Sequence, residues 1–156
     1  MKKLLATSSV LAIAAGIILI LGGIGGISFT YSKIAAEHIV TPTDSAIPGV
    51  PVRGPLTLKA QADIMRVHVL KMTGGKTYAE MPRQIAKVDE AGKPVLDTDG
   101  KEVMVPNTAR DIWVTYTALT TALNLGLLTY AFSSMVILIG CISLWTGMIF
   151  FRMSKA

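Results

Sequence analysis

The feature that most constrains the fold of this chain is a pair of long runs without any charged side chain. The first run extends from Leu4 to Phe29 (26 residues) and the second from Ile112 to Phe151 (40 residues). A helix needs about 20 mostly apolar residues to cross the hydrocarbon core of a bilayer. Both runs exceed that length, so the sequence predicts a mainly α-helical membrane protein whose two long transmembrane helices form an antiparallel hairpin.

Lys2 and Lys3, which precede the first run, would also suit a cleavable signal peptide. The apolar region of a signal peptide is usually about 7 to 15 residues long and ends at small residues. Here the apolar region continues to Phe29 without an Ala-x-Ala site. We therefore expect the first run to remain in the protein as a transmembrane helix.

The basic residues predict the orientation of the hairpin, because Lys and Arg close to a transmembrane helix stay on the cytoplasmic side. Lys2, Lys3, Arg152 and Lys155 flank the outer ends of the two runs. The other 11 basic residues (15 − 4) and all 10 acidic residues lie between the runs, which gives that segment a net charge of +1. We predict a multi-pass protein of the cell membrane, with both termini cytoplasmic and residues of about 32–128 extracytoplasmic. The basic excess then reflects topology, and no nucleic-acid partner is expected.

Aromatic side chains divide the second run into two parts, since Trp and Tyr favour the membrane interfaces. Tyr130 marks the outer interface and Trp145 the inner one, whereas the residues before Tyr130 include several threonines and are too polar for lipid. We predict an N-terminal transmembrane helix (1–34), an extracytoplasmic segment (35–111) and a long C-terminal helix (112–156), the last with an outer stalk (about 112–128) and a transmembrane part (about 129–151).

Small residues recur at intervals of seven in both runs, which keeps them on one helix face and lets two backbones approach closely. In an antiparallel pair, Gly16 would lie between Gly140 and Gly147, and Gly23 between Ser133 and Gly140. The predicted helix-packing residues are Gly16, Gly23, Gly126, Ser133, Gly140 and Gly147. Gly22 and Gly26 also form a G-x-x-x-G motif, which suits packing within the chain or contact with another subunit.

The extracytoplasmic segment reads as a small α+β unit. Thr41–Arg53 is rich in Pro and Gly and predicts an extended linker, and the following residues predict an amphipathic helix from about Pro55 to Thr73. Its apolar stripe is expected to pack on the outer stalk, with the membrane surface as the alternative, and consists of Leu58, Ala62, Met65, Val69 and Met72.

Beyond this helix, Thr77 and Glu80 have the spacing of a capping box. Residues Pro94–Val105 then predict a β-hairpin that turns across Asp97-Thr98-Asp99-Gly100.

No segment of the sequence carries a complete catalytic, cofactor or metal motif. Gly74-Gly75-Lys76-Thr77 resembles the end of a P-loop, but the first glycine of that motif is replaced by Leu70. The turn at Asp97–Gly100 lacks the closing glutamate of a calcium loop, where Pro106 stands instead. His38 and His68 are too few for a metal site, and the single Cys141 suits a helix contact. We expect a protein that is not an enzyme and binds no cofactor.

Several short stretches resemble a known family. Ala36-Glu37-His38-Ile39-Val40, Gly54-Pro55-Leu56-Thr57 and the segment from Met72 to Met81 are similar to small two-span membrane proteins of actinobacteria. Automated naming often labels that family an aromatic ring-opening dioxygenase, yet this chain lacks the histidines and carboxylate that would hold the iron of such enzymes. The resemblance implies the two-span topology, and residues from about Ile85 to Val105 depart from the family pattern.

These features favour a non-catalytic accessory or structural subunit of a larger cell-membrane complex, with a respiratory complex as one candidate. Its expected partners are the lipid bilayer and other integral membrane proteins or further copies of itself. The alternative is an extracytoplasmic binding or sensing module for a small molecule, lipid or envelope component. An apolar pocket beneath the stripe would favour the second reading.

Overall fold

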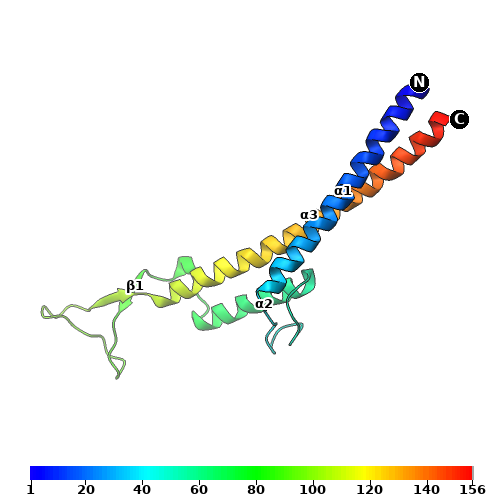
Figure 1. The fold of residues 1–156 in the computed structure, drawn as a ribbon. Helices are drawn as coiled ribbons and strands as arrows, with labels where there is room; N and C mark the ends of the chain where they lie inside the picture. The colour runs from blue at the N-terminus through cyan, green and yellow to red at the C-terminus, as the bar shows by residue number, and fades with distance from the viewer. Residues whose placement is uncertain (156) are drawn as a thin grey trace. The chain divides into compact units, whose positions relative to one another are not determined.

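The computed structural model describes residues 1–155 and is mainly helical, with one small two-stranded sheet. Its elements are, in chain order, α1 (Lys2–Ala36), α2 (Pro55–Met72), the 3-10 turn η1 (Tyr78–Glu80), β1 (Gln84–Ala86), β2 (Met104–Pro106) and α3 (Thr108–Lys155) (Figure 1). Two of the described helices, α1 and α3, are long and apolar enough to cross a membrane. The predicted C-terminal segment ends at Ala156, which lies outside the described residues.

The chain divides into two compact units. The first contains Met1–Gln61 together with the part of α3 from Leu123 onward, and the second contains Ala62–Ala122. In the first unit, α1 and the C-terminal part of α3 lie side by side, and the first residues of α1 and the last residues of α3 are at the same end of the pair (Figure 1). These two helix segments are therefore antiparallel.

The loop between α1 and α2 is folded back on itself, so the prediction of an extended linker over Thr41–Arg53 is wrong. The amide of Thr41 donates to the carbonyl of Val50, and the amide of Gly49 donates to the carbonyl of Thr41, both over 3.0 Å. The Thr41 hydroxyl also accepts from the Val50 amide at 3.0 Å. Only 2% of Thr41 is exposed. One buried threonine thus closes the loop through hydrogen bonds that the Pro and Gly content of the segment does not predict.

The second unit has a small core where the end of α2 meets the start of α3. Its buried members are Val69, Met81 and Trp113. The indole Nε1–H of Trp113 donates to the Lys76 carbonyl at 2.8 Å. The Trp113 ring also meets Tyr116 edge to face, with the ring centroids 5.0 Å apart. Trp113 therefore connects α3 to the chain that follows α2.

The 3-10 turn η1 is held by the predicted capping box, which is confirmed. The amide and the hydroxyl of Thr77 both donate to Glu80 Oε2 at 2.7 Å. On the other side of this turn, the Arg110 guanidinium donates to the carbonyl of Tyr78 and stacks 3.8 Å from the Tyr78 ring centroid. Cation–π and hydrogen-bond contacts thus fix the turn against α3.

The ribbon, which we define as residues 84–106, contains the predicted hairpin and extends beyond it. The hairpin turns at Asp97–Gly100 as predicted and is closed by the bridge between Leu96 and Glu102 and by a hydrogen bond from the Asp97 amide to the Lys101 carbonyl. The prediction did not include the antiparallel pairing of β2 with β1. Two turns of the same form separate β1 from β2. In each, an aspartate carboxylate accepts from two backbone amides, Asp89 from those of Ala91 and Lys93, and Asp97 from those of Asp99 and Lys101.

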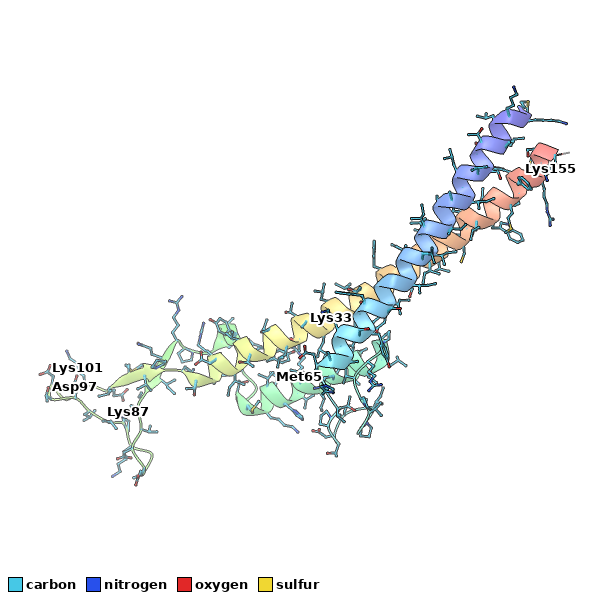
Figure 2. All side chains as sticks on the ribbon, in the orientation of Figure 1. Lys33, Met65, Lys87, Asp97, Lys101 and Lys155 are labelled. Atoms are coloured by element: carbon cyan, nitrogen blue, oxygen red, sulfur yellow. The ribbon has the colours of Figure 1, made fainter. Side chains whose placement is uncertain are left out.

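The two turns bring three segments of the ribbon together. The Lys87 amide donates to the Val103 carbonyl, the Val103 amide to the Val95 carbonyl and the Val95 amide to the Lys87 carbonyl, at 2.7–2.9 Å. Figure 2 shows Asp97 and Lys101 at the tip of the ribbon, with Lys87 nearer its base. The prediction missed β1 because its strand partner lies beyond both turns.

Candidate functional site

The first candidate feature is the seam, the contact between Ser9, Gly16 and Gly23 of α1 and Ser133, Gly140 and Gly147 of α3. Ser9, Gly16, Gly23 and Thr30 are the buried residues of α1. A Cβ atom added to Gly16 would lie 2.7 Å from the carbonyl oxygen of Gly140 and 2.8 Å from the amide nitrogen of Leu144. Neither atom belongs to a movable side chain, so this contact leaves no room for any side chain at Gly16.

The other glycines of the seam have equally close neighbours. A Cβ atom at Gly23 would lie 2.8 Å from the Ser133 carbonyl oxygen, and one at Gly147 would lie 3.1 Å from the Ser9 carbonyl oxygen. Gly126 faces Ile34 and Leu58 instead, at 3.2 and 3.3 Å. The structure thus brings together the predicted helix-packing residues, with Gly126 at a three-helix contact outside the seam.

Two interhelical hydrogen bonds reinforce the seam. The Ser9 hydroxyl donates to the Gly147 carbonyl at 2.9 Å, and the Ser143 hydroxyl donates to the carbonyl of Ala12 at 2.8 Å. Both hydroxyls therefore have partners inside an otherwise apolar pair of helices, as their burial requires. Sequence spacing missed Ser143.

The G-x-x-x-G motif of α1 is divided between two environments. Gly26 faces the Ser133 side chain, whereas a Cβ atom at Gly22 would meet nothing within 4 Å. Gly25 is equally open. One glycine of the motif therefore packs within the chain, and the other lies on a free face of α1.

The second candidate feature is the groove, an apolar hollow of about 590 Å³ within the second unit. Its α2 wall is formed by Met65, His68, Val69 and Met72. Met65 is labelled on α2 in Figure 2. The volume falls within the range of about 300–1,000 Å³ that is usual for small-molecule sites.

The α3 wall of the groove has two chemically different rows. Ile112, Tyr116 and Leu119 form an apolar row, and Thr108, Asp111 and Thr115 form a polar one. Each row repeats at steps of three or four residues, so each lies along one face of the helix. The groove therefore has an apolar floor and one polar rim.

The predicted stripe of α2 does not form one continuous buried contact. Leu58 is fully buried and Val69 is 1% exposed, but Met72 is 60% exposed. Leu58 meets Gly126 in the first unit, whereas Met65, Val69 and Met72 line the groove of the second. Ala62 is half-buried, and the buried positions of α2 also include Ala60 and Ile64. Met72 is the last residue of α2, and the chain beyond it contacts α3 through Thr73 and Lys76, which both accept from the Trp113 indole. The Met72 side chain is therefore left largely exposed beside the groove.

The described residues form no cluster of potential metal ligands. Among residues 1–155, no group of three or more His, Cys, Asp or Glu side chains could hold a metal ion. Gly74 and Gly75 have positive φ angles of 61° and 80° and form the turn after α2. A left-handed turn of this kind is a common end for a helix. His38 also has a positive φ angle, 53°, directly after α1.

Comparison with protein-family models, curated protein sequences and solved structures gives no match to this chain. The similarity to the actinobacterial two-span family stays a prediction. The seam and the groove are therefore the features of this chain that bear on its function.

Sequence reasoning named a pocket beneath the stripe only as a mark of the alternative function, and it missed Trp113. The stripe of α2 was recognisable, but the hollow depends on which face of α3 meets it. The sequence does contain a signal for Trp113, namely its position. It stands at the start of the second uncharged run, where a large aromatic residue suits a contact outside the membrane.

Proposed function

We propose that this chain is a non-catalytic, membrane-anchored binding module whose groove receives an apolar ligand outside the membrane. The observation that supports this most directly is the groove, since a hollow of about 590 Å³ with an apolar floor and one polar rim suits an apolar molecule with a polar end. Both methionines in its wall are flexible side chains, which adapt readily to different apolar shapes.

Membrane insertion of α1 and α3 is the second part of the proposal. Large apolar side chains on both helices point away from the seam, among them Leu11, Ile18, Leu138 and Ile142, each more than 60% exposed. Lipid would cover these side chains and remove their contact with water. In this arrangement both termini are cytoplasmic, and the ribbon and the groove are extracytoplasmic.

The orientation can be tested with single cysteines in a Cys141→Ser background. A membrane-impermeant maleimide, added to intact cells, should label Glu90→Cys in the ribbon and leave Lys2→Cys unlabelled until the membrane is opened. Labelling of Lys2→Cys in intact cells would contradict the proposed topology.

Ligand binding can be tested with decanol as a neutral apolar probe, on the protein in nanodiscs of phosphatidylcholine. The chain has two tryptophans, so Trp145→Phe leaves Trp113 as the only indole, and Trp113 packs beside Val69 in the groove wall. We expect a saturable change of Trp113 emission with decanol concentration. It should be lost in Leu119→Gln and retained in Val114→Gln, because Val114 is 56% exposed on the same helix and does not line the groove. A response that is linear, or equal in both variants, would contradict binding in the groove.

A second candidate function, an accessory or structural subunit of a larger membrane complex, is favoured by the ribbon. Ile85, Val88, Leu96 and Met104 are between 41% and 57% exposed. A thin ribbon with apolar side chains on its surface has little core of its own, and such side chains suit contact with another integral membrane protein or a second copy.

This candidate predicts that a partner is retained through the ribbon. Native purification in mild detergent should recover the chain with a fixed set of membrane proteins, and the double variant Val88→Ser with Leu96→Ser should lose them. Val10→Ser with Leu11→Ser, at exposed positions of α1, is the matched control. Recovery of the unaltered chain alone would count against the accessory role.

A further inference from the structure

We propose that the groove selects amphiphiles with a single apolar chain and a cationic headgroup, which rests on the proposed binding function and specifies its ligand class. The polar rim formed by Thr108, Asp111 and Thr115 gives the groove this preference. Asp111 is the one carboxylate in the lining, and no basic side chain of Lys or Arg lines the groove among the described residues.

Two groups of the rim, the Thr115 hydroxyl and the Asp111 carboxylate, offer hydrogen-bond acceptors to a ligand. The Thr115 hydroxyl already donates to the backbone carbonyl of Asp111 at 3.1 Å, so its oxygen is left as an acceptor. An ionised carboxylate likewise only accepts. A headgroup that donates hydrogen bonds or carries positive charge therefore suits this rim, whereas an anionic headgroup would face Asp111.

The backbone amides at the start of α3 do not offer a binding site for an anionic headgroup either. The Ala109 amide donates to Asn107 Oδ1 at 3.1 Å, and the Arg110 amide donates to the Asn107 carbonyl at 3.0 Å. Asn107 thus caps amides that could otherwise bind an anion. The nearest basic residue in sequence, Arg110, is bound to the carbonyls of Tyr78 and Met81.

The floor of the groove adds an aromatic contact. Tyr116 lines the groove, and aromatic faces attract organic cations such as quaternary ammonium groups. The apolar chain would lie along Met65, Val69 and Leu119, where the lining has no charged group. An amphiphile would thus place its chain on the apolar floor and its cation beside Asp111.

The test compares three probes that have the same alkyl chain and different headgroups: decyltrimethylammonium, decanol and decanoate. Each is titrated into nanodiscs that hold the Trp145→Phe protein, and the midpoint of the Trp113 response is corrected for partition into empty nanodiscs. We expect decyltrimethylammonium to bind about tenfold more tightly than decanoate, from the summed carboxylate and aromatic contributions.

Variants locate the origin of that preference. Asp111→Asn should reduce the ratio to about twofold or less, Asp111→Glu should retain most of it, and the ribbon variant Asp99→Asn should leave it unchanged. A ratio near one in the unaltered groove, tighter binding of decanoate, or a preference that survives Asp111→Asn would overturn the inference.

The two proposals fail in different ways. If decanol binds and Leu119→Gln abolishes its binding while the headgroups are not distinguished, the binding function stands and the cationic preference is wrong. If none of the three probes gives a saturable response, both are wrong, and an amphipathic helix of a partner protein becomes the occupant to test.

Discussion

The seam and the groove are both contacts between helices, but they differ in the size of the side chains that meet. In the seam, glycine faces backbone, and a Cβ atom at Gly16 would lie 2.7 Å from Gly140. In the groove, longer side chains such as Met65 and Leu119 hold the helices apart around a hollow of about 590 Å³. Small residues therefore close a helix pair, and long flexible ones keep it open enough to receive a ligand.

The largest expected effect is a loss of stability in the second unit. Trp113→Ala should lower its stability by about 3–5 kcal/mol, because it removes a buried indole and leaves the Lys76 carbonyl without its donor. The measurement is amide hydrogen exchange of residues 73–80 in nanodiscs. Trp145→Ala is the matched control, since Trp145 is 66% exposed. Equal loss of protection in both variants would contradict the anchoring role of Trp113.

A smaller loss of stability is expected when the seam is overpacked. Gly16→Ala forces a methyl group against the Gly140 carbonyl, and overpacking of this kind costs about 1–3 kcal/mol. Gly22→Ala places the same methyl group in open space and should be neutral or slightly stabilising. Reversible unfolding in mixed micelles measures both. If the two variants have the same stability, the close approach at Gly16 is wrong.

The loop that joins α1 to α2 can be loosened by removing one hydroxyl. The Tyr130 hydroxyl donates to the Arg53 carbonyl at 2.6 Å, and Tyr130 is 7% exposed. Tyr130→Phe should cost about 0.5–1.5 kcal/mol, measured as the unfolding free energy in the same micelles. Tyr78→Phe, at a residue that is 44% exposed, should cost less. The opposite order would show that the bond to Arg53 contributes little.

The smallest effect concerns pH. The Thr77 hydroxyl and amide hold the pKa of Glu80 below its ordinary value, by hydrogen bonds to the carboxylate. A depressed pKa in the folded state gives stability that is present above the unfolded pKa and lost as pH falls through the folded pKa. Acid should therefore open the turn at residues 77–80.

NMR can follow this opening through the chemical shift of the Thr77 amide during acid titration. The shift should change with a midpoint below that of an ordinary glutamate, and the titration should disappear in Glu80→Gln. A midpoint at or above the ordinary value would contradict the capping role of the carboxylate.

The two regions also differ in how far the sequence predicts them. The seam depends on a seven-residue spacing within each helix, and that local pattern was enough to propose which glycines would meet. The groove depends on the angle at which α2 meets α3 and on the end of α2 at Met72, which local patterns do not determine. Strand β1 was missed because Gln84–Ala86 has only a short apolar signal and its partner β2 follows two turns.

The loop after α1 also differs from what its local sequence pattern predicts. Its Pro and Gly content predicted an extended chain, whereas the buried Thr41 closes the loop through several hydrogen bonds. Composition indicates where a chain turns, but a single polar side chain can decide whether the turn is closed.

The most direct test of an open groove is methyl NMR of the methionines in nanodiscs during titration with decanol. The binding proposal predicts saturable shifts of the Met65 and Met72 methyl groups, and no such shift of Met104, which is 48% exposed on the ribbon. Saturable shifts that are equal at all three methionines, or absent at Met65 and Met72, would contradict a binding groove between α2 and α3.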